Sequence, residues 1–340
     1  MAQVRTRTDL PILLLHNVDH SWTGPEIEEV EQAVSELQTA VAELGHPVVS
    51  APLHNPDLPS LLRQFDPDDY VVLNWCEAIP GISHSDYRVA QMLEDSGFTF
   101  TGACADALAF SWDKPRVKER LTQHGITIPR WRLYSRAQKD GWNCFPAIVK
   151  ASLEHSSVGI STESVVLSPD EMEHRIEYVL DTYAQPAIVE DFIDGREFYV
   201  PVFGDGDPHI LAPVEMDYGF FQDVHQRLCT FDAKFTPGSN QYEEINARVP
   251  ADLTPYEYAQ LERICLAAFT AVQCRDYARM DVRLRDGIFY VIDVNPNADI
   301  SADASIARAA AAEGYTYGQM ISHLITLAAE RHPRFKQHWF

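Results

Sequence analysis

The feature that most constrains the fold is a pair of short apolar runs near the C-terminal end, residues 278–282 and 290–294. Two such runs joined by a glycine-containing turn predict an antiparallel hairpin. Across that hairpin three oxygen donors would lie together beside Arg279, namely Asp281, Asp293 and Asn295. Such donors beside an arginine suit Mg²⁺ holding a polyphosphate, because Mg²⁺ keeps bound water and takes few carboxylates. A surface hairpin with ordinary acidic residues is the alternative.

The length and the charge of the chain limit the classes of protein to which it can belong. The chain has 340 residues, which is typical of two or three packed subdomains. Its formal net charge of −23 should repel nucleic acid and anionic membranes, although a local basic pocket can still hold phosphates. The sequence contains no apolar run long enough to span a membrane, and no secretory signal is seen. Six scattered cysteines without a CxxC pair indicate reduced thiols in a cytoplasmic protein.

The order of predicted elements indicates three parts. Strands at 11–15, 48–51 and 70–73 alternate with helices at 27–44 and 86–96, which predicts a parallel sheet covered by helices in residues 1–106. Residues 107–197 hold a helix to His124 and strands at 126–133, 146–150 and 187–193. Residues 198–340 form the third part. Strands dominate it to about residue 297, interrupted by a helix at 255–273, and a last helix spans 317–331.

A nucleotide site in this chain would have to work without a P-loop. The sequence has no GxxxxGK[ST] motif, and no GxGxxG follows a first strand. Phosphate binding would then depend on lysine side chains and a small-residue loop. Lys114 and Lys150 are candidates, and the loop at Ser156, Ser157, Val158 and Gly159 offers hydroxyls and closely approaching N–H groups. A plain turn and solvated lysines are the structural alternative.

Taken in order, these segments resemble the ATP-grasp superfamily, and most closely its D-alanine–D-alanine ligase-like branch. The similarity extends from about residue 100 to residue 300. The matching segments are Asp113-Lys114, Pro146 to Lys150, Ser156 to Gly159, Glu190 to Glu197, Ala233-Lys234, Arg279 to Asp281 and Asp293 to Asn295.

The resemblance implies a fold and an activity. The fold would combine α/β and α+β parts: an N-terminal parallel-sheet domain, a small central ATP-binding subdomain and a C-terminal mixed-sheet domain. The activity would be ATP-dependent joining of a small-molecule carboxylate to an amine through an acyl phosphate, with ATP and two Mg²⁺ ions as cofactors and Mn²⁺ as a substitute metal. No nucleic-acid or membrane partner is expected. The oligomeric state stays open, a homodimer included.

The resemblance also implies roles for individual residues. Lys114, Lys150 and Lys234 would contact phosphates, and Ser156, Ser157, Val158 and Gly159 would form the loop over them. Adenine would be bound by a hinge formed by Glu190, Asp191, Phe192 and Ile193, in which Glu190 would accept from the adenine amino group. Glu197 would accept from the ribose hydroxyls. Asp281, Asp293 and Asn295 would hold the metals. Arg279 would be catalytic, stabilising the acyl phosphate and the tetrahedral intermediate, together with Lys234 and Ser156.

The departures from the family pattern lie in the substrate pockets. Ala298-Asp299 stands where a Pro-Gly turn is usual, and the loop after the first strand, residues 16–22, lacks the expected glycines and glutamate. Phe235 replaces a common tyrosine, and His155 replaces a glycine. These differences favour a carboxylate or amine other than D-alanine, such as an amino-acid derivative or natural-product precursor. Asp299 would oppose a carboxylate-bearing acceptor, unless its side chain turns outward to solvent.

Other functions remain as alternatives. A true D-alanine–D-alanine ligase, an idle nucleotide-binding homologue, and an ATP-grasp phosphotransferase or thiol ligase would share the nucleotide residues. His16 and His20 could be imagined as a metal pair, but they lie in a loop without a third ligand, so pocket lining or polar surface is favoured.

Overall fold

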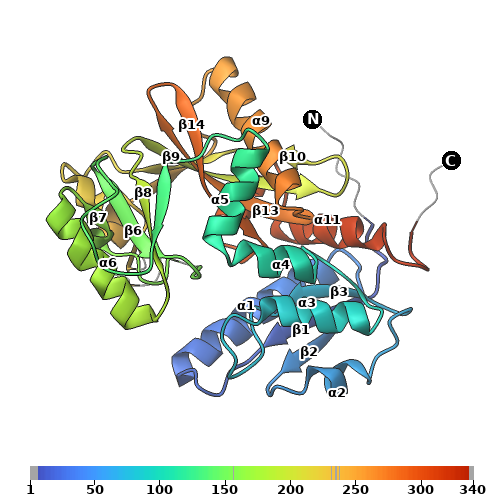
Figure 1. Ribbon diagram of the computed structural model, residues 1–340. Helices are drawn as coiled ribbons and strands as arrows, with labels where there is room; N and C mark the ends of the chain where they lie inside the picture. Colours follow the sequence, from blue (N-terminus) through green and yellow to red (C-terminus); the bar gives the residue numbers. More distant parts are fainter. Residues whose placement is uncertain (1–6, 156, 231, 234–235, 237, 337–340) are drawn as a thin grey trace.

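The computed structural model describes residues 7–155, 157–230, 232–233, 236 and 238–336. These residues form three sheets (Figure 1). No helix within them is both long and apolar enough to cross a membrane. The predicted boundaries between the three parts, at residues 106 and 197, stay a proposal.

The N-terminal sheet is parallel, as predicted. Its strands lie in the order β2 (Val48–Leu53), β1 (Ile12–Asn17), β3 (Val71–Trp75) and β4 (Thr99–Phe100). Ile12 and Leu14 pack with α1 (Gly24–Ala42) and α11 (Tyr317–Ala329). Leu13 and Leu15 face the other side, which is covered by α2 (Leu58–Leu62), α3 (Asp86–Asp95) and α4 (Ala105–Ser111). Burial on both faces explains why β1 begins with four consecutive apolar residues, Ile12 to Leu15.

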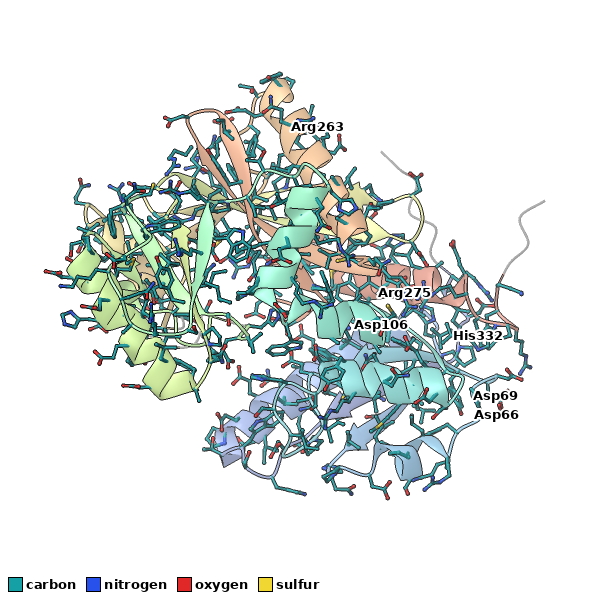
Figure 2. All side chains as sticks on the ribbon, viewed as in Figure 1. Asp66, Asp69, Asp106, Arg263, Arg275 and His332 are labelled. Atoms are coloured by element: carbon teal, nitrogen blue, oxygen red, sulfur yellow. The ribbon has the colours of Figure 1, made fainter. Side chains whose placement is uncertain are left out.

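The end of the chain returns to this N-terminal part. Helix α11 packs against α1, and just beyond it His332 Nε2 lies 3.0 Å from the carbonyl oxygen of Pro67. Arg334 donates to Asp69 over 2.7 Å, and Figure 2 labels Asp69 and His332 in this corner. The C-terminal segment therefore helps to close the core of the first sheet.

The central sheet is antiparallel and small. Its order is β5 (Trp131–Tyr134), β8 (Ala187–Asp191), β6 (Ala147–Ala151) and β7 (Val165–Val166). Helix α6 (Pro169–Tyr183), which we did not predict, covers one face. The strand expected at 126–133 begins only at Trp131. Pro129 has no N–H to donate to a ladder, which explains the late start.

The C-terminal sheet differs from the expected mixed sheet. Its strands lie in the order β12 (Asn246–Arg248), β11 (Val214–Asp217), β9 (Arg196–Gly204), β13 (Asp276–Arg285) and β14 (Ile288–Pro296), and β10 (His209–Ile210) pairs with β9. Every pairing between these strands is antiparallel, so the expectation of a mixed sheet was wrong. The short turn of the β13–β14 hairpin requires antiparallel pairing of these two strands, because parallel neighbours need long crossovers.

Helices α5 (Lys114–Gln123) and α9 (Pro255–Ala271) pack on the apolar face of the C-terminal sheet. Two further helices are α8 (Asn240–Glu244) and α10 (Ser305–Ala312), and short 3₁₀ turns occupy Thr162–Ser164 and Val224–Gln226.

A buried charge network joins the C-terminal sheet to the N-terminal part. Asp276 is fully buried and accepts hydrogen bonds from Arg331 at 2.6 and 2.7 Å and from the Gly102 N–H at 2.8 Å. Burial raises the pKa of the Asp276 carboxyl despite these donors. Arg331 also donates to the carbonyl of Phe100 over 3.0 Å, so one guanidinium binds both parts.

Close approach of the backbone at Gly195 predicts a stability effect. A Cβ added at Gly195 would lie 2.0 Å from the carbonyl oxygen of Leu284 in β13. We expect Gly195→Ala to lower the free energy of unfolding by about 1–3 kcal/mol, the usual cost of overpacking. Gly24→Ala is the matched control, since nothing lies within 4 Å of its added Cβ. Chemical denaturation of both variants is the measurement, and equal midpoints would contradict the prediction.

Candidate active site

A cleft of about 850 Å³ lies where the three sheets meet. Its walls contain residues from the N-terminal part, the central sheet and the C-terminal sheet. It is lined by most of the predicted site residues that the structure describes: Lys114, Lys150, Ser157, Val158, Glu190, Asp191, Phe192, Ile193, Glu197, Arg279, Asp281, Asp293 and Asn295. Ser156 and Lys234 lie outside the described residues, so their predicted roles stay predictions.

The predicted hairpin is confirmed, and it forms one wall of the cleft. Strands β13 and β14 pair with Asp281 opposite Asp293 and Arg279 opposite Asn295. Directly opposite residues in an antiparallel pair project to the same face, and so do residues two apart. The two carboxylates and the amide therefore share one face with Arg279. Arg279 donates to both oxygens of Asp281, at 2.7 and 3.0 Å.

Strand β13 carries a row of three arginines on its cleft face, and each is paired with an acid. Arg283 is opposite Glu197 of β9 and donates to it over 2.7 Å. Arg285 donates to Asp191 over 2.7 Å, next to the hinge. Sequence reasoning missed both of these arginines. The signal was present, because charged residues alternate with apolar ones from Arg279 to Arg285.

A buried cluster of two lysines and one glutamate lies beside the hinge. Glu190 is within 3.0 Å of Lys118 Nζ and 3.1 Å of Lys150 Nζ, and its side chain is 1% exposed. Burial disfavours the Glu190 carboxylate, but attraction to the two lysines is larger and lowers its pKa. Lys118 was also missed. It follows Lys114 by four residues in α5, a spacing that places both on one helix face.

Lys114 reaches the metal-ligand candidates directly. Its Nζ lies 3.0 Å from Asp293 Oδ2. Burial opposes ionisation of Asp293, but Lys114 and His155 hold the pKa of that carboxyl well below its usual range. Asp293 is therefore a carboxylate at any pH near neutrality.

The hinge between β8 and β9 includes a backbone donor that is free among the residues described. Asp191 N–H donates to Arg130 O and Phe192 N–H to Pro146 O, at 2.9 and 3.1 Å. The N–H of Ile193 has no hydrogen-bond partner among the residues described. Arg283 fixes the Ile193 carbonyl over 2.9 Å. The geometry thus offers a backbone donor to a flat ligand in the cleft.

The loop after β6 approaches the C-terminal part. Ser157 Oγ donates to the carbonyl of Cys229 over 3.2 Å, and Ile160 N–H donates to Ser157 O over 2.9 Å. Gly159 lies at the base of this loop, outside the lining, and its carbonyl accepts from Arg175 over 2.7 Å.

Trp112 links the loop to the N-terminal part. Its ring centroid lies 4.3 Å from those of both His84 and His155, and its Nε1 donates to Asp86 over 2.8 Å. His84 Nε2 lies 3.0 Å from Glu154 Oε2. His155, which we noted only as a departure from the family pattern, is thus part of the cleft wall.

Acidic side chains of the N-terminal part and of the segment after β14 also line the cleft. Glu77, Asp86 and Asp299 all line it. Loss of solvent, followed by the charges of Asp299 and Asp86, raises the pKa of Glu77. The sequence left open whether Asp299 faces the acceptor pocket or solvent. Its side chain is exposed at the lining of the cleft and accepts from the N–H and the hydroxyl of Ser301, at 2.9 and 2.6 Å.

Other features noted in the sequence do not belong to the cleft. His16 is 6% exposed and its Nε2 lies 3.1 Å from Ser50 Oγ, while His20 stacks on His54. No group of three or more histidine, cysteine, aspartate or glutamate side chains within the described ranges could hold a metal.

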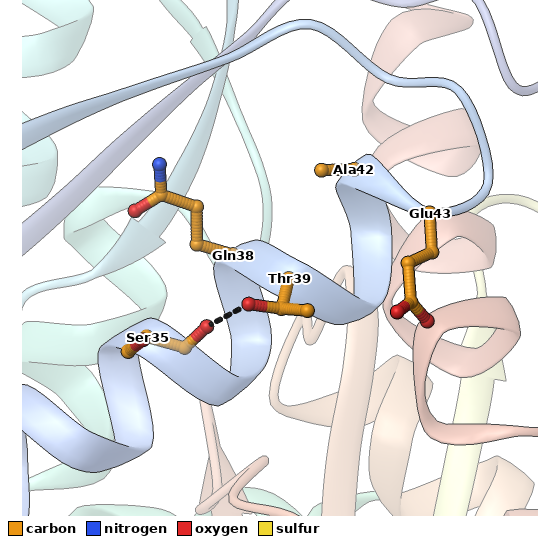
Figure 3. A pocket seen from close by; sticks show the side chains of 5 residues that line it. All are labelled: Ser35, Gln38, Thr39, Ala42 and Glu43. Carbon is orange, nitrogen blue, oxygen red and sulfur yellow. Dashed lines mark hydrogen bonds between the residues drawn. The ribbon is translucent and has the colours of Figure 1, made fainter.

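A second hollow of about 550 Å³ lies along α1 (Figure 3), where Thr39 donates to the carbonyl of Ser35 over 2.8 Å. Its lining offers no cation, and we assign it no function.

Comparison with known proteins agrees with this architecture. The family model described as the D-ala D-ala ligase C-terminus matches residues 123–326, which is more than half of the chain. A D-alanine–D-alanine ligase of Desulforudis audaxviator is 26% identical over 260 residues, covering 75% of this chain and 80% of the relative. An uncharacterised protein of Sinorhizobium fredii is 29% identical over 303 residues, covering 86% of each.

Solved structures show the same fold. A D-alanine–D-alanine ligase from Bacillus anthracis complexed with ATP superposes with a TM-score of 0.71, at 20% identity, over 94% of this chain and 97% of that one. The enzyme from Coxiella burnetii gives 0.70 at 19% identity, over 96% and 95%.

Fold, cleft and family match together define an ATP-grasp ligase, an enzyme that forms carbon–nitrogen bonds. Within that class the chain belongs to the D-alanine–D-alanine ligase family.

The position of His155 predicts a pH effect on stability. Burial, with the charge of Lys114, lowers the pKa of His155 to about 4. Between that value and the ordinary pKa of about 6.5 the unfolded chain binds a proton that the folded chain does not, so stability falls as pH falls. At pH 5 this amounts to about 2 kcal/mol relative to neutral pH.

Denaturation midpoints at pH 7.5 and pH 5 test this effect. We expect His155→Asn to reduce the difference between the two pH values. His174→Asn, on the exposed face of α6, should behave like the wild type. An unchanged pH dependence in His155→Asn would contradict the assignment.

Proposed function

We propose that the chain uses ATP and Mg²⁺ to activate a small-molecule carboxylate and then joins it to an amine, releasing ADP and phosphate. The observation that carries this proposal is the meeting of Lys114, Lys150 and Arg279 with the oxygen-donor face of the β13–β14 hairpin in one cleft. Family membership supports it, because the named relatives are D-alanine–D-alanine ligases.

The donor chemistry fits a divalent metal. Asp281, Asp293 and Asn295 supply two carboxylates and an amide on one face, and triphosphate oxygens and water would complete such a shell. We propose two Mg²⁺ ions here, with Mn²⁺ as a substitute. When bound, the metal would neutralise charge on the transferring phosphoryl group.

The described residues can then be given roles in binding ATP. Lys114 and Lys150 would hold phosphate oxygens, and the loop at Ser157 and Val158 would keep water away from the reacting atoms. The Ile193 N–H would donate to the base, and Glu197 would accept from ribose. Ser156 and Lys234 lie outside the described residues and keep their proposed roles, Ser156 in the loop over the phosphates and Lys234 as a further lysine that contacts phosphate.

Glu190 is proposed to accept from the adenine amino group in addition to the two lysines that it already contacts. Its carboxylate is already engaged by Lys118 and Lys150, so an adenine amino group would be an additional donor to it. A carboxylate has about four lone-pair sites and can accept all three donors.

The chemistry has two steps. A substrate carboxylate oxygen attacks the γ-phosphorus, and the bond to ADP breaks, which gives an acyl phosphate. The amine nitrogen then attacks the acyl carbon, the bond to phosphate breaks, and the amine loses a proton. Arg279 would stabilise the oxyanion that grows in the second step, since a fixed cation is most effective where charge develops.

Replacement of Asp293 tests the metal face. Asp293→Asn should lower ADP release roughly a hundredfold or more, because several kcal/mol of phosphoryl-charge stabilisation depend on the metal. Circular dichroism should remain native-like. Asp286→Asn is the matched control, since Asp286 lies exposed at the turn of the same hairpin. Full activity of Asp293→Asn at ordinary Mg²⁺ concentrations would refute the metal assignment.

We further propose that the substrates are not two D-alanine molecules. The support is that Asp299 and Glu77 both line the cleft in which we propose that the substrates bind. A D-alanine acceptor brings a carboxylate, and opposed like charges disfavour binding. An amine without a neighbouring carboxylate, such as an amino-acid derivative or natural-product precursor, would avoid this repulsion.

A substrate panel tests this proposal. ADP release should be slower with D-alanine alone than with other amino acids, larger acids or amines in pairs, and mass spectrometry would identify the amide formed. If D-alanine alone gives the highest kcat/KM and the dipeptide appears, the chain is an ordinary D-alanine–D-alanine ligase.

A further inference from the structure

Arg283 is the most completely engaged side chain in the cleft wall. Its Nε donates to Glu197 Oε2 over 2.7 Å, and its Nη2 contacts the same carboxylate. Nη1 donates to the carbonyl of Ile193 over 2.9 Å, and Nη2 to that of Arg227 over 2.6 Å. The guanidinium carbon lies 4.6 Å from the ring centroid of Phe192 and 5.5 Å from that of Tyr218.

The sheet register places Arg283 there. Strands β9 and β13 pair with Glu197 directly opposite Arg283, so both side chains project to the cleft face. Each residue is nearly buried, at 4% and 3% exposure. A planar guanidinium held by several acceptors and two rings has a single orientation, and the carboxylate bound to it is fixed as well.

The two groups that Arg283 holds are those proposed to read the nucleoside. Glu197 would accept from the ribose hydroxyls, and Ile193 would offer its N–H to the base. Both guanidinium contacts fall on Oε2 of Glu197, so they leave Oε1 to other donors. The bond to the Ile193 carbonyl orients the same peptide segment whose N–H is unused within the described chain.

We propose that Arg283 is a positioning residue that sets the preference for ribonucleotides over deoxyribonucleotides by fixing the carboxylate of Glu197. The inference rests on the proposed function, because it assumes that ATP occupies this cleft. A lysine cannot replace the arginine, since a single ammonium cannot hold Glu197 and two carbonyls in one plane.

The test compares kcat/KM for ATP with that for 2′-deoxy-ATP and 3′-deoxy-ATP. The wild type should prefer ATP by roughly ten- to a hundredfold over at least one analogue, the value of a hydrogen bond to a charged group. Arg283→Lys should reduce this preference to within about threefold, while kcat at saturating ATP changes less. Arg263→Lys, at an exposed position of α9 labelled in Figure 2, is the matched control and should retain the preference.

A second pair of variants keeps the test valid if Arg283→Lys does not fold. Glu197→Gln combined with Arg283→Gln leaves no unpaired buried charge. If Arg283 acts through Glu197, the double variant should show the same nucleotide ratio and the same kcat/KM for ATP as Glu197→Gln alone, within about twofold.

The outcomes separate the inference from the proposed function. No ADP release and no Mg-ATP binding by the wild type would defeat the proposed function. An active wild type without a ribose preference, or Arg283→Lys with the preference intact, would overturn the inference alone. A further loss of activity in the double variant would likewise show that Arg283 acts independently of Glu197.

Discussion

The alternation of side chains along β13 is the constraint on which the rest of the structure depends. Ala278, Met280, Val282 and Leu284 pack into the core with α5 and α9. Between them lie Arg279, Asp281 and Arg283, which are charged and line the wall of the cleft. Because successive side chains of a strand project to opposite faces, one ten-residue strand both closes a core and presents the site. A shift of one residue in register would bury the arginines and expose the core, so folding and function select the same register.

The parts of the site that are local in sequence could be predicted, and the parts that depend on pairing between distant segments could not. The hairpin and the shared face of Asp281, Asp293 and Asn295 follow from the two apolar runs and their turn. The partners of Arg283 and Arg285 do not, because they depend on the register between β9 and β13, strands separated by about seventy residues.

Helix α6 was missed for a different reason. Ser168, Pro169 and Glu171 form a good start signal, since Ser168 Oγ accepts from Glu171 N–H, but the signal was not weighed.

The net charge of the whole chain says little about the electrostatics of the cleft. The chain carries −23 overall, yet the walls of the cleft gather Lys114, Lys150, Arg279 and Arg283. Each of these cations contacts a carboxylate at 3.1 Å or less. Uncompensated charges at such depth would be costly, and pairing makes the arrangement tolerable in the free protein. The composition predicted repulsion of nucleic acid, but it could not show where the few cations would collect.

This pairing suggests how the cleft would accept a highly charged ligand without a large rearrangement. We propose that each of the carboxylates Asp281 and Asp293 binds a cationic side chain in the free protein and a metal when ATP is bound. If Asp293 turns from Lys114 toward a metal, the ammonium of Lys114 gains capacity for a phosphate oxygen, since it has three donors and contacts Asp293 alone among the described residues. Arg279 is placed similarly, over the ring of Tyr199 at 4.4 Å and bound to Asp281. The ring and the strand hold Arg279 in position whichever anion it faces. Cations that exchange one oxygen partner for another need only small side-chain movements, which favours a preorganised site.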